Sequence, residues 1–232
     1  MKHAYLIVVV AVVLGMALAL VTVPSVMANN NPQNKVIASP GLSAQWWEWA
    51  ISIPTSHNPL LDVTGDDCVV GQRGSVWFLA GKFSGGSAIR TCSLPEGKAL
   101  FFPVVNSVNI NSPNVCGQGS GNLSVKELRA TVAAFIDGIT SISVQLDGQA
   151  IDARRIKSAV FAVPMPADNI FVQPCNGDSP AGVYSPAVDD GYYVALDPLQ
   201  SGNHALHFHA QFQGETVQDV TYNLIVVPVL RK

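Results

Sequence analysis

Three histidines near the C-terminal end of the chain have the spacing that most directly suggests chemistry. They are His204, His207 and His209. On an extended strand His204 falls on the apolar face, whereas His207 and His209 project together from the more polar face. We expect His204 to be a buried, hydrogen-bonded histidine. For His207 and His209 two interpretations stay open: an ordinary solvated strand face, or a pair of imidazoles that binds zinc or copper.

Such a metal site would need further ligands from elsewhere in the chain. One other histidine, His57, follows the N-terminal segment, and the candidate carboxylates are Asp62, Asp66, Glu215 and Asp219. The sequence alone does not bring any of them close to the histidine pair.

The tryptophan-rich stretch Trp46 to Trp49 suggests either sugar stacking or core packing. Helical spacing places Trp46 and Trp49 on one apolar stripe and leaves Trp47 as the partly exposed ring. We therefore expect core packing for two of these residues and predict Trp47 as a binding residue.

An acidic turn, Asp62 to Asp67, precedes the first cysteine and contains three aspartates. Clustered oxygens suit calcium. The spacing lacks the alternation of an EF-hand, so we favour a turn capped by its own side chains.

The loop Asn106–Asn122 is rich in Asn, Ser and Gly and carries Cys116. Loops of this length are frequently functional. A disulfide from Cys116 to Cys175 would join it to another irregular segment, 174–186, and create a composite surface at one end of the fold. We predict this surface as a binding edge, with Asn109 and Asn111 as binding residues.

All four cysteines lie beyond the first 60 residues, and an even number is typical of a disulfide-bonded exported protein. Of the three possible connectivities we favour Cys68 with Cys92 and Cys116 with Cys175, because the first pair flanks one strand-rich segment. A metal cluster is the less favoured alternative, since no C-x-x-C spacing occurs.

The N-terminus has the three parts of a signal peptide over residues 1–28. Lys2 is followed by an apolar run, and Val26, Met27 and Ala28 form a cleavage site. An uncleaved anchor is the alternative, because the run approaches the ~20 residues that span a bilayer. A membrane is therefore expected as a partner only through an uncleaved signal. Either reading predicts a secreted or cell-envelope protein.

Composition argues against nucleic acid as a partner. The chain has a net charge of −3, and loss of Lys2 with the signal makes the remainder more acidic. Phosphate binding leaves a basic footprint that this chain lacks. We expect an extracellular ligand that the sequence does not identify.

Hydrophobic periodicity predicts a mainly β fold, a β-sandwich or jelly-roll-like domain with two short helices packed on it. After a flexible leader at 29–39, one disulfide-stapled domain covers 40–232. Helices are expected from Pro40 to about Ile53 and after a capping box at Ser124 and Glu127, with Gly138 at the end. Strands are expected at 75–83, 88–94, 98–105, 141–146, 158–163, 192–196, 205–212 and 218–229.

Several stretches together resemble a family of exported prokaryotic proteins to which no activity is assigned. They are WWEWA from Trp46, DVTG from Asp62 with Cys68, GSVWFLAG from Gly74, and GKALFFPVVN from Gly97. The resemblance implies an exported domain with cysteines and a closing β-region, and nothing about activity, cofactor or partner.

The function expected first is an extracytoplasmic binding or structural module of the cell envelope without catalysis. No G-x-S-x-G elbow or recognisable triad occurs. A metal-binding protein or metal-dependent enzyme using His207 and His209 is the alternative. A carbohydrate-active enzyme is a further alternative, because its two carboxylates need no sequence motif.

Overall fold

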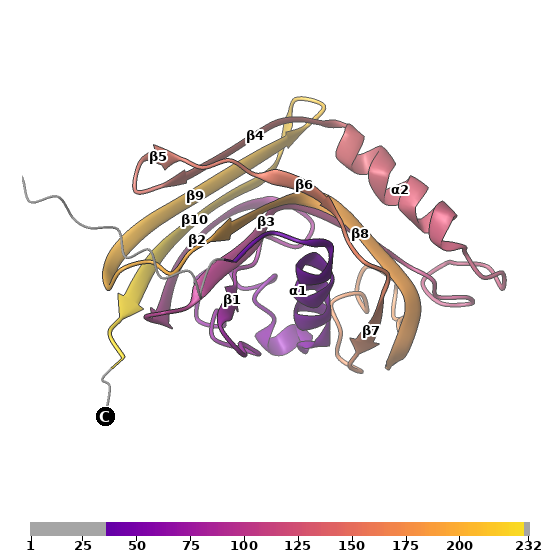
Figure 1. The fold of residues 1–232 in the computed structure, drawn as a ribbon. Coiled ribbons are helices and arrows are strands. Elements are labelled where there is room, and N and C mark those ends of the chain that lie inside the picture. Colours follow the sequence, from indigo (N-terminus) through magenta and orange to yellow (C-terminus); the bar gives the residue numbers. More distant parts are fainter. Residues whose placement is uncertain (1–35, 230–232) are drawn as a thin grey trace, which may run out of the picture. The chain divides into compact units, whose positions relative to one another are not determined.

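The computed structural model describes residues 36–229, which form a β-sandwich with two short helices (Figure 1). The helices are α1 (Pro40–Ser52) and α2 (Val125–Asp137), with a 3-10 turn at Thr55–His57. The strands are β1 (Val76–Phe78), β2 (Gly86–Pro95), β3 (Ala99–Ile110), β4 (Ile139–Leu146), β5 (Gln149–Ala150), β6 (Arg154–Lys157), β7 (Phe161–Met165), β8 (Gly182–Leu196), β9 (Gly202–Phe212) and β10 (Glu215–Val227). The predicted fold class is confirmed.

The strands make two mixed sheets. Sheet A has the order β1-β3-β8-β6, with β7 also paired to β8, and sheet B has the order β2-β10-β9-β4-β5. The predicted signal peptide, residues 1–28, lies outside the described residues, as does most of the predicted leader. Between residues 36 and 229 no helix is both long and apolar enough to cross a membrane.

Helix α1 begins and ends where its sequence predicts. The Ser39 hydroxyl accepts a hydrogen bond from the Leu42 amide, and Pro40 occupies the first turn, where its missing N–H costs nothing. Pro54 prevents the helix from continuing. Figure 1 shows α1 on the side of sheet A that faces away from sheet B, where it packs on β7, β6 and β8.

Helix α2 also follows its prediction. Ser124 and Glu127 form a complete capping box, and Gly138 is the C-cap. Its buried residues Leu128 and Val132 pack on Val188 of β8. Both helices therefore cover sheet A.

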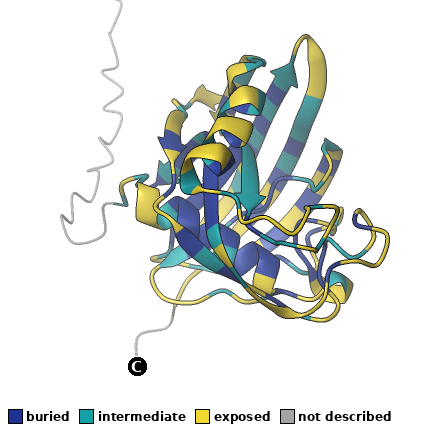
Figure 2. Ribbon diagram, turned by 90° about the vertical axis from the view of Figure 1, so that its right-hand side faces the viewer, coloured by how far each residue is buried: buried dark blue, intermediate teal, exposed yellow. Residues whose placement is uncertain are grey.

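The main core fills the space between the sheets. Alternate residues of β9 point into it, so Leu206, Phe208 and Ala210 are fully buried. Phe208 stacks on Phe102 of sheet A with ring centroids 5.2 Å apart. Along β9 and β10, buried residues alternate with exposed or half-buried ones (Figure 2). One face of sheet B is therefore covered and the other faces solvent.

Four strands differ most from their predicted bounds, and the short strands β5 and β6 were not predicted. Strand β1 is only three residues long, β3 extends to Ile110 and β7 is displaced to Phe161–Met165. Strand β8 begins ten residues earlier than expected, because its polar and proline-containing first half pairs with β3 and β7. The pairs β1–β3 and β2–β10 are parallel, so they join segments that no tight turn connects.

Candidate functional site

A cavity of about 380 Å³ lies at one end of sheet A, and we call it the end cavity. Five parts of the chain form its wall: the end of β3, the loop after it, the end of β7, the segment between β7 and β8, and the start of β8. The wall residues are Val108, Asn109, Ile110, Ser112, Val115, Cys116, Gly117, Gln118, Leu123, Met165, Phe171, Cys175, Ser179 and Tyr184. This is the composite surface that the two irregular segments predicted.

A disulfide between Cys116 and Cys175 joins the two irregular segments across the wall. The Cys116 amide also donates to the carbonyl of Asp178 over 3.0 Å and to its carboxylate over 2.8 Å. The other disulfide is Cys68–Cys92, inside the main core, so both pairs are those that the sequence favoured. The two bonds indicate an oxidising environment.

Asn111 is a buried support of the loop and does not belong to the cavity wall. Its amide nitrogen donates to Asn122 and to the Ser185 carbonyl, at 3.0 and 3.3 Å. Its amide oxygen accepts from the Leu123 amide and from Gln118. Every polar atom of this side chain is therefore engaged. Of the two predicted binding asparagines, the structure places only Asn109 in the wall.

The wall contains no ionisable carboxylate, imidazole, ammonium or guanidinium group, since none of its residues is Asp, Glu, His, Lys or Arg. Six wall residues have apolar side chains: Val108, Ile110, Val115, Leu123, Met165 and Phe171. The phenol of Tyr184 donates to the Pro180 carbonyl over 2.8 Å, and burial raises its pKa, as does the negative charge of Asp178. The cavity thus offers apolar surface and a few neutral polar groups, which is the usual composition of a small-molecule site.

Trp47 is buried, and the prediction that it is partly exposed is wrong. Only 5% of the residue is accessible, and its indole nitrogen donates to Asp189 of β8 over 2.8 Å. Helical spacing placed Trp47 outside the core stripe. The prediction failed because β8 covers a second side of α1 and buries this ring. The other two rings, Trp46 and Trp49, pack in the core as predicted.

His207 and His209 lie on the solvent-facing side of sheet B, away from the end cavity. The Nε2 atom of His207 is 2.8 Å from Asp219 Oδ1, and Nδ1 of His209 is 3.9 Å from the same oxygen. The hydrogen bond from His207 lowers the pKa of the Asp219 carboxyl. Within residues 36–229 no group of three or more His, Cys, Asp or Glu residues is arranged to hold a metal ion.

His204 is hydrogen-bonded as predicted, although it is only partly buried. Its Nδ1 lies 2.7 Å from Asp147 Oδ2, and its Nε2 lies 2.9 Å from the Gln200 carbonyl. Burial acts to lower the pKa of His204, but these two acceptors outweigh it and raise the pKa. Both ring nitrogens are therefore occupied.

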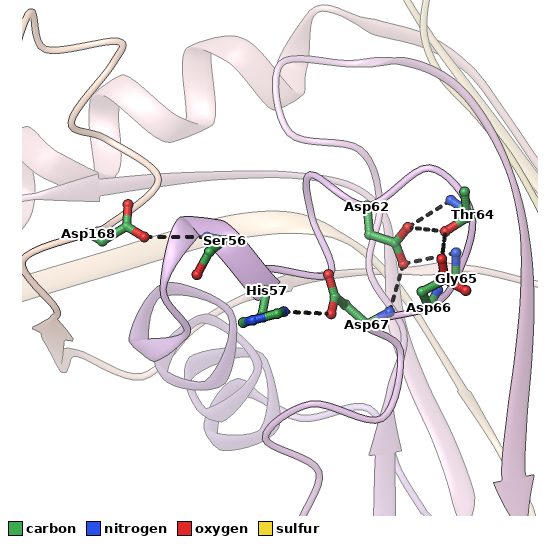
Figure 3. A network of polar contacts seen from close by, with 8 residues as sticks. All are labelled: Ser56, His57, Asp62, Thr64, Gly65, Asp66, Asp67 and Asp168. Atoms are coloured by element: carbon green, nitrogen blue, oxygen red, sulfur yellow. Dashed lines mark hydrogen bonds and ion pairs between the residues drawn. The ribbon is translucent and has the colours of Figure 1, made fainter.

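The side chain of Asp62 caps the backbone of the acidic turn, as Figure 3 shows. The carboxylate of Asp62 accepts from the amides of Thr64, Gly65 and Asp67 at 2.7 to 3.0 Å. Burial acts to raise the pKa of Asp62, but these hydrogen bonds outweigh it and lower the pKa. Because N–H donors occupy both of its oxygens, the turn is the capped turn that the sequence favoured.

Comparison of the chain with protein-family models, with curated proteins and with solved structures found no match. The resemblance to exported prokaryotic proteins therefore stays a prediction.

Most wall residues lie in the two segments that the sequence predicted as a binding edge, and Leu123, Met165 and Phe171 are the wall residues outside them. Met165 and Phe171 come just before the predicted segment 174–186 and read as ordinary apolar residues. The only signal that pointed to them was Cys175, because its pairing with Cys116 brings their segment to the loop.

Proposed function

We propose that the protein is an extracytoplasmic binding module of the cell envelope that carries out no catalysis, and that the end cavity is its ligand site. The observation that carries the proposal is the construction of this cavity. Two irregular segments 59 residues apart are held together by a disulfide around a mainly apolar space. Irregular segments held on a rigid β scaffold are a common way to build binding sites.

The chemistry of the wall favours binding over catalysis. General acid–base catalysis uses a histidine, carboxylate or amine that is close to the substrate. The end cavity has none of these in its wall, and both of its cysteines are in a disulfide. A glycosidase would need two carboxylates beside its substrate, so this cavity does not favour a carbohydrate-active enzyme.

A thermal-shift screen of uncharged metabolites tests the proposal on the full chain. Val108→Trp places a large ring in the wall and should abolish the stabilisation that a cavity ligand produces. Ser120→Trp is the matched control, because Ser120 is exposed in the same loop and lies outside the wall. A ligand that stabilises the unsubstituted protein, Val108→Trp and Ser120→Trp equally binds elsewhere. Conversion of a bound ligand to a product would contradict a purely binding role.

A two-histidine metal site on sheet B is the second candidate function. The observation that favours it is that His207 and His209 project from one exposed face toward the same carboxylate oxygen of Asp219. Imidazole suits zinc and copper, and water would complete the coordination. Isothermal titration of chelator-treated protein with zinc or copper should show binding that is lost in His207→Ala/His209→Ala and kept in His57→Ala. No heat of binding to the unsubstituted protein would remove this candidate.

A further inference from the structure

We infer that the end cavity takes a neutral, mainly apolar small molecule whose carbonyl or hydroxyl oxygen accepts a hydrogen bond from Asn109. This inference rests on the proposed function, because it names the class of ligand for the same cavity.

Charge is the first argument. A charged ligand loses its hydration on entering a cavity, and this cost is recovered only where an opposite charge or several hydrogen bonds meet it. None of the wall residues carries a charge, and the chain as a whole is acidic. An anion would therefore lose its hydration without an opposite charge to replace it, whereas an uncharged molecule loses only the much weaker hydration of its few polar groups.

Most polar groups of the wall are already engaged, which limits where a ligand can be recognised. The Gln118 side chain accepts from the Ser112 amide and donates to Asn111 and the Gly121 carbonyl. The Ser179 hydroxyl is buried and donates to Asn169 over 2.9 Å. These groups hold the wall together and have little capacity left for a ligand.

Asn109 is the exception. Its amide oxygen accepts from the Ile110 backbone amide over 2.9 Å, which fixes the orientation of the side-chain amide. The amide nitrogen then has no hydrogen-bond partner among residues 36–229 and keeps two N–H groups for a ligand. An uncharged carbonyl or hydroxyl oxygen is the complementary group. The phenol oxygen of Tyr184, which donates to Pro180, still has lone pairs to accept from a hydroxyl.

Three naphthalene dyes of similar size separate charge from hydrogen bonding. They are 6-propionyl-2-dimethylaminonaphthalene, an uncharged ketone; N-phenyl-1-naphthylamine, which is uncharged and has no carbonyl; and 8-anilino-1-naphthalenesulfonate, which adds a sulfonate to the second. Fluorescence titration of the full chain should show binding of both uncharged dyes. The sulfonate should bind at least about tenfold more weakly, because the wall offers it no counter-charge.

Substitution of Asn109 then tests the hydrogen bond. Asn109→Leu should weaken binding of the ketone about five- to tenfold, which is the effect of losing one hydrogen bond, and should change binding of the naphthylamine less than about twofold. Asn223→Leu is the matched control, since Asn223 is exposed on β10 outside the end cavity. Circular dichroism and thermal melting should show that both variants fold like the unsubstituted protein.

The outcomes distinguish the inference from the function on which it rests. If no dye loses binding in Val108→Trp, the end cavity is not the ligand site and the proposed function fails. If Val108→Trp abolishes binding but the sulfonate binds as tightly as the uncharged dyes, the site stands and the neutral-ligand inference is wrong. The same holds if Asn109→Leu weakens the ketone and the naphthylamine equally.

Discussion

At the scale of single residues, the three neighbouring tryptophans of α1 each use the indole nitrogen to join the helix to a different segment. Trp46 donates to the Leu79 carbonyl and Trp49 to the Val70 carbonyl, both over 3.0 Å. Trp47 donates to Asp189 over 2.8 Å. A buried indole needs such a partner, because an unpaired N–H in the core costs free energy. These rings are therefore structural and do not stack on sugars.

Replacing Trp47 by phenylalanine should destabilise the fold more than the same change at Trp77. Both rings are buried, but the Trp77 indole nitrogen has no hydrogen-bond partner among the described residues. Each substitution loses similar apolar area, whereas only Trp47→Phe removes one of the two hydrogen bonds that the buried Asp189 carboxylate accepts. We expect a difference of about 1 to 3 kcal/mol in the free energy of unfolding, measured in urea. Equal losses would show that the Trp47–Asp189 hydrogen bond contributes nothing.

At the scale of elements, the ends of α2 show how local sequence and distant packing act together. Its start depends on the capping box of Ser124 and Glu127, which is local. Its end depends on Gly138, where a side chain would collide with the ring of Phe212 on β9. Phe212 in turn stacks on Phe135, with ring centroids 5.0 Å apart. Glycine at this position therefore allows the helix to approach sheet B closely.

Ser124→Ala should lower the free energy of unfolding by about 1 kcal/mol, because it leaves the Glu127 amide without the Ser124 hydroxyl as acceptor. Ser120→Ala is the control, since Ser120 is exposed in the loop before the helix. Chemical denaturation measures both variants. A loss as large in Ser120→Ala as in Ser124→Ala would contradict a capping effect.

The tie between the two cavity segments can also be tested at this scale. Cys116→Ser/Cys175→Ser should lower the free energy of unfolding by about 4 kcal/mol, because the bond closes a loop with a sequence separation of 59. Cys68→Ser/Cys92→Ser is the comparison variant, because it removes the other disulfide, which lies in the main core and has a sequence separation of 24. Only the first variant should also weaken binding in the end cavity. Unchanged dye affinity would show that the disulfide does not shape the site.

At the scale of the whole molecule, two adjacent buried acids on β8 are stabilised in different ways on the two faces of sheet A. Asp190 forms a two-pronged ion pair with Arg155 of β6, at 2.9 and 2.8 Å. Asp189 accepts from Trp47 and from Tyr193, and its Oδ2 atom has no partner among the described residues. Burial raises the pKa of Asp189 to about 7, although these two hydrogen bonds act to lower it.

This raised pKa predicts a pH dependence of stability that Asp189→Asn should remove. The stabilising effect of protonation is fully present below the ordinary pKa of an aspartate and is lost as pH rises through the folded-state pKa of about 7. Between pH 4 and pH 7 the unsubstituted protein should therefore lose up to about 4 kcal/mol of unfolding free energy relative to Asp189→Asn.

Urea unfolding across this pH range, with Asp197→Asn as the exposed control, measures the effect. Asp197→Asn should follow the unsubstituted protein. Parallel curves for Asp189→Asn and the unsubstituted protein would contradict the assignment to Asp189.

Local patterns in the sequence determined much of this protein. Caps and proline predicted both helices, because these signals act within a single turn of chain. Alternating apolar residues predicted the mainly β class. The turn between β4 and β5 is equally local, because Asp147 and Gly148 both adopt the positive φ that such a turn requires. The number of cysteines predicted two disulfides, since pairing needs only an even count in an oxidising location.

Only the tertiary structure decided the features that depend on partners far along the chain. Trp47 is buried because Asp189, 142 residues later, accepts its hydrogen bond. The first half of β8 is a strand because neighbouring strands satisfy its backbone, although its own sequence contains Pro186 and two aspartates. The end cavity exists because a disulfide and sheet A bring together segments that have no common local pattern. Propensity acts over a few residues, whereas burial and pairing depend on the complete fold.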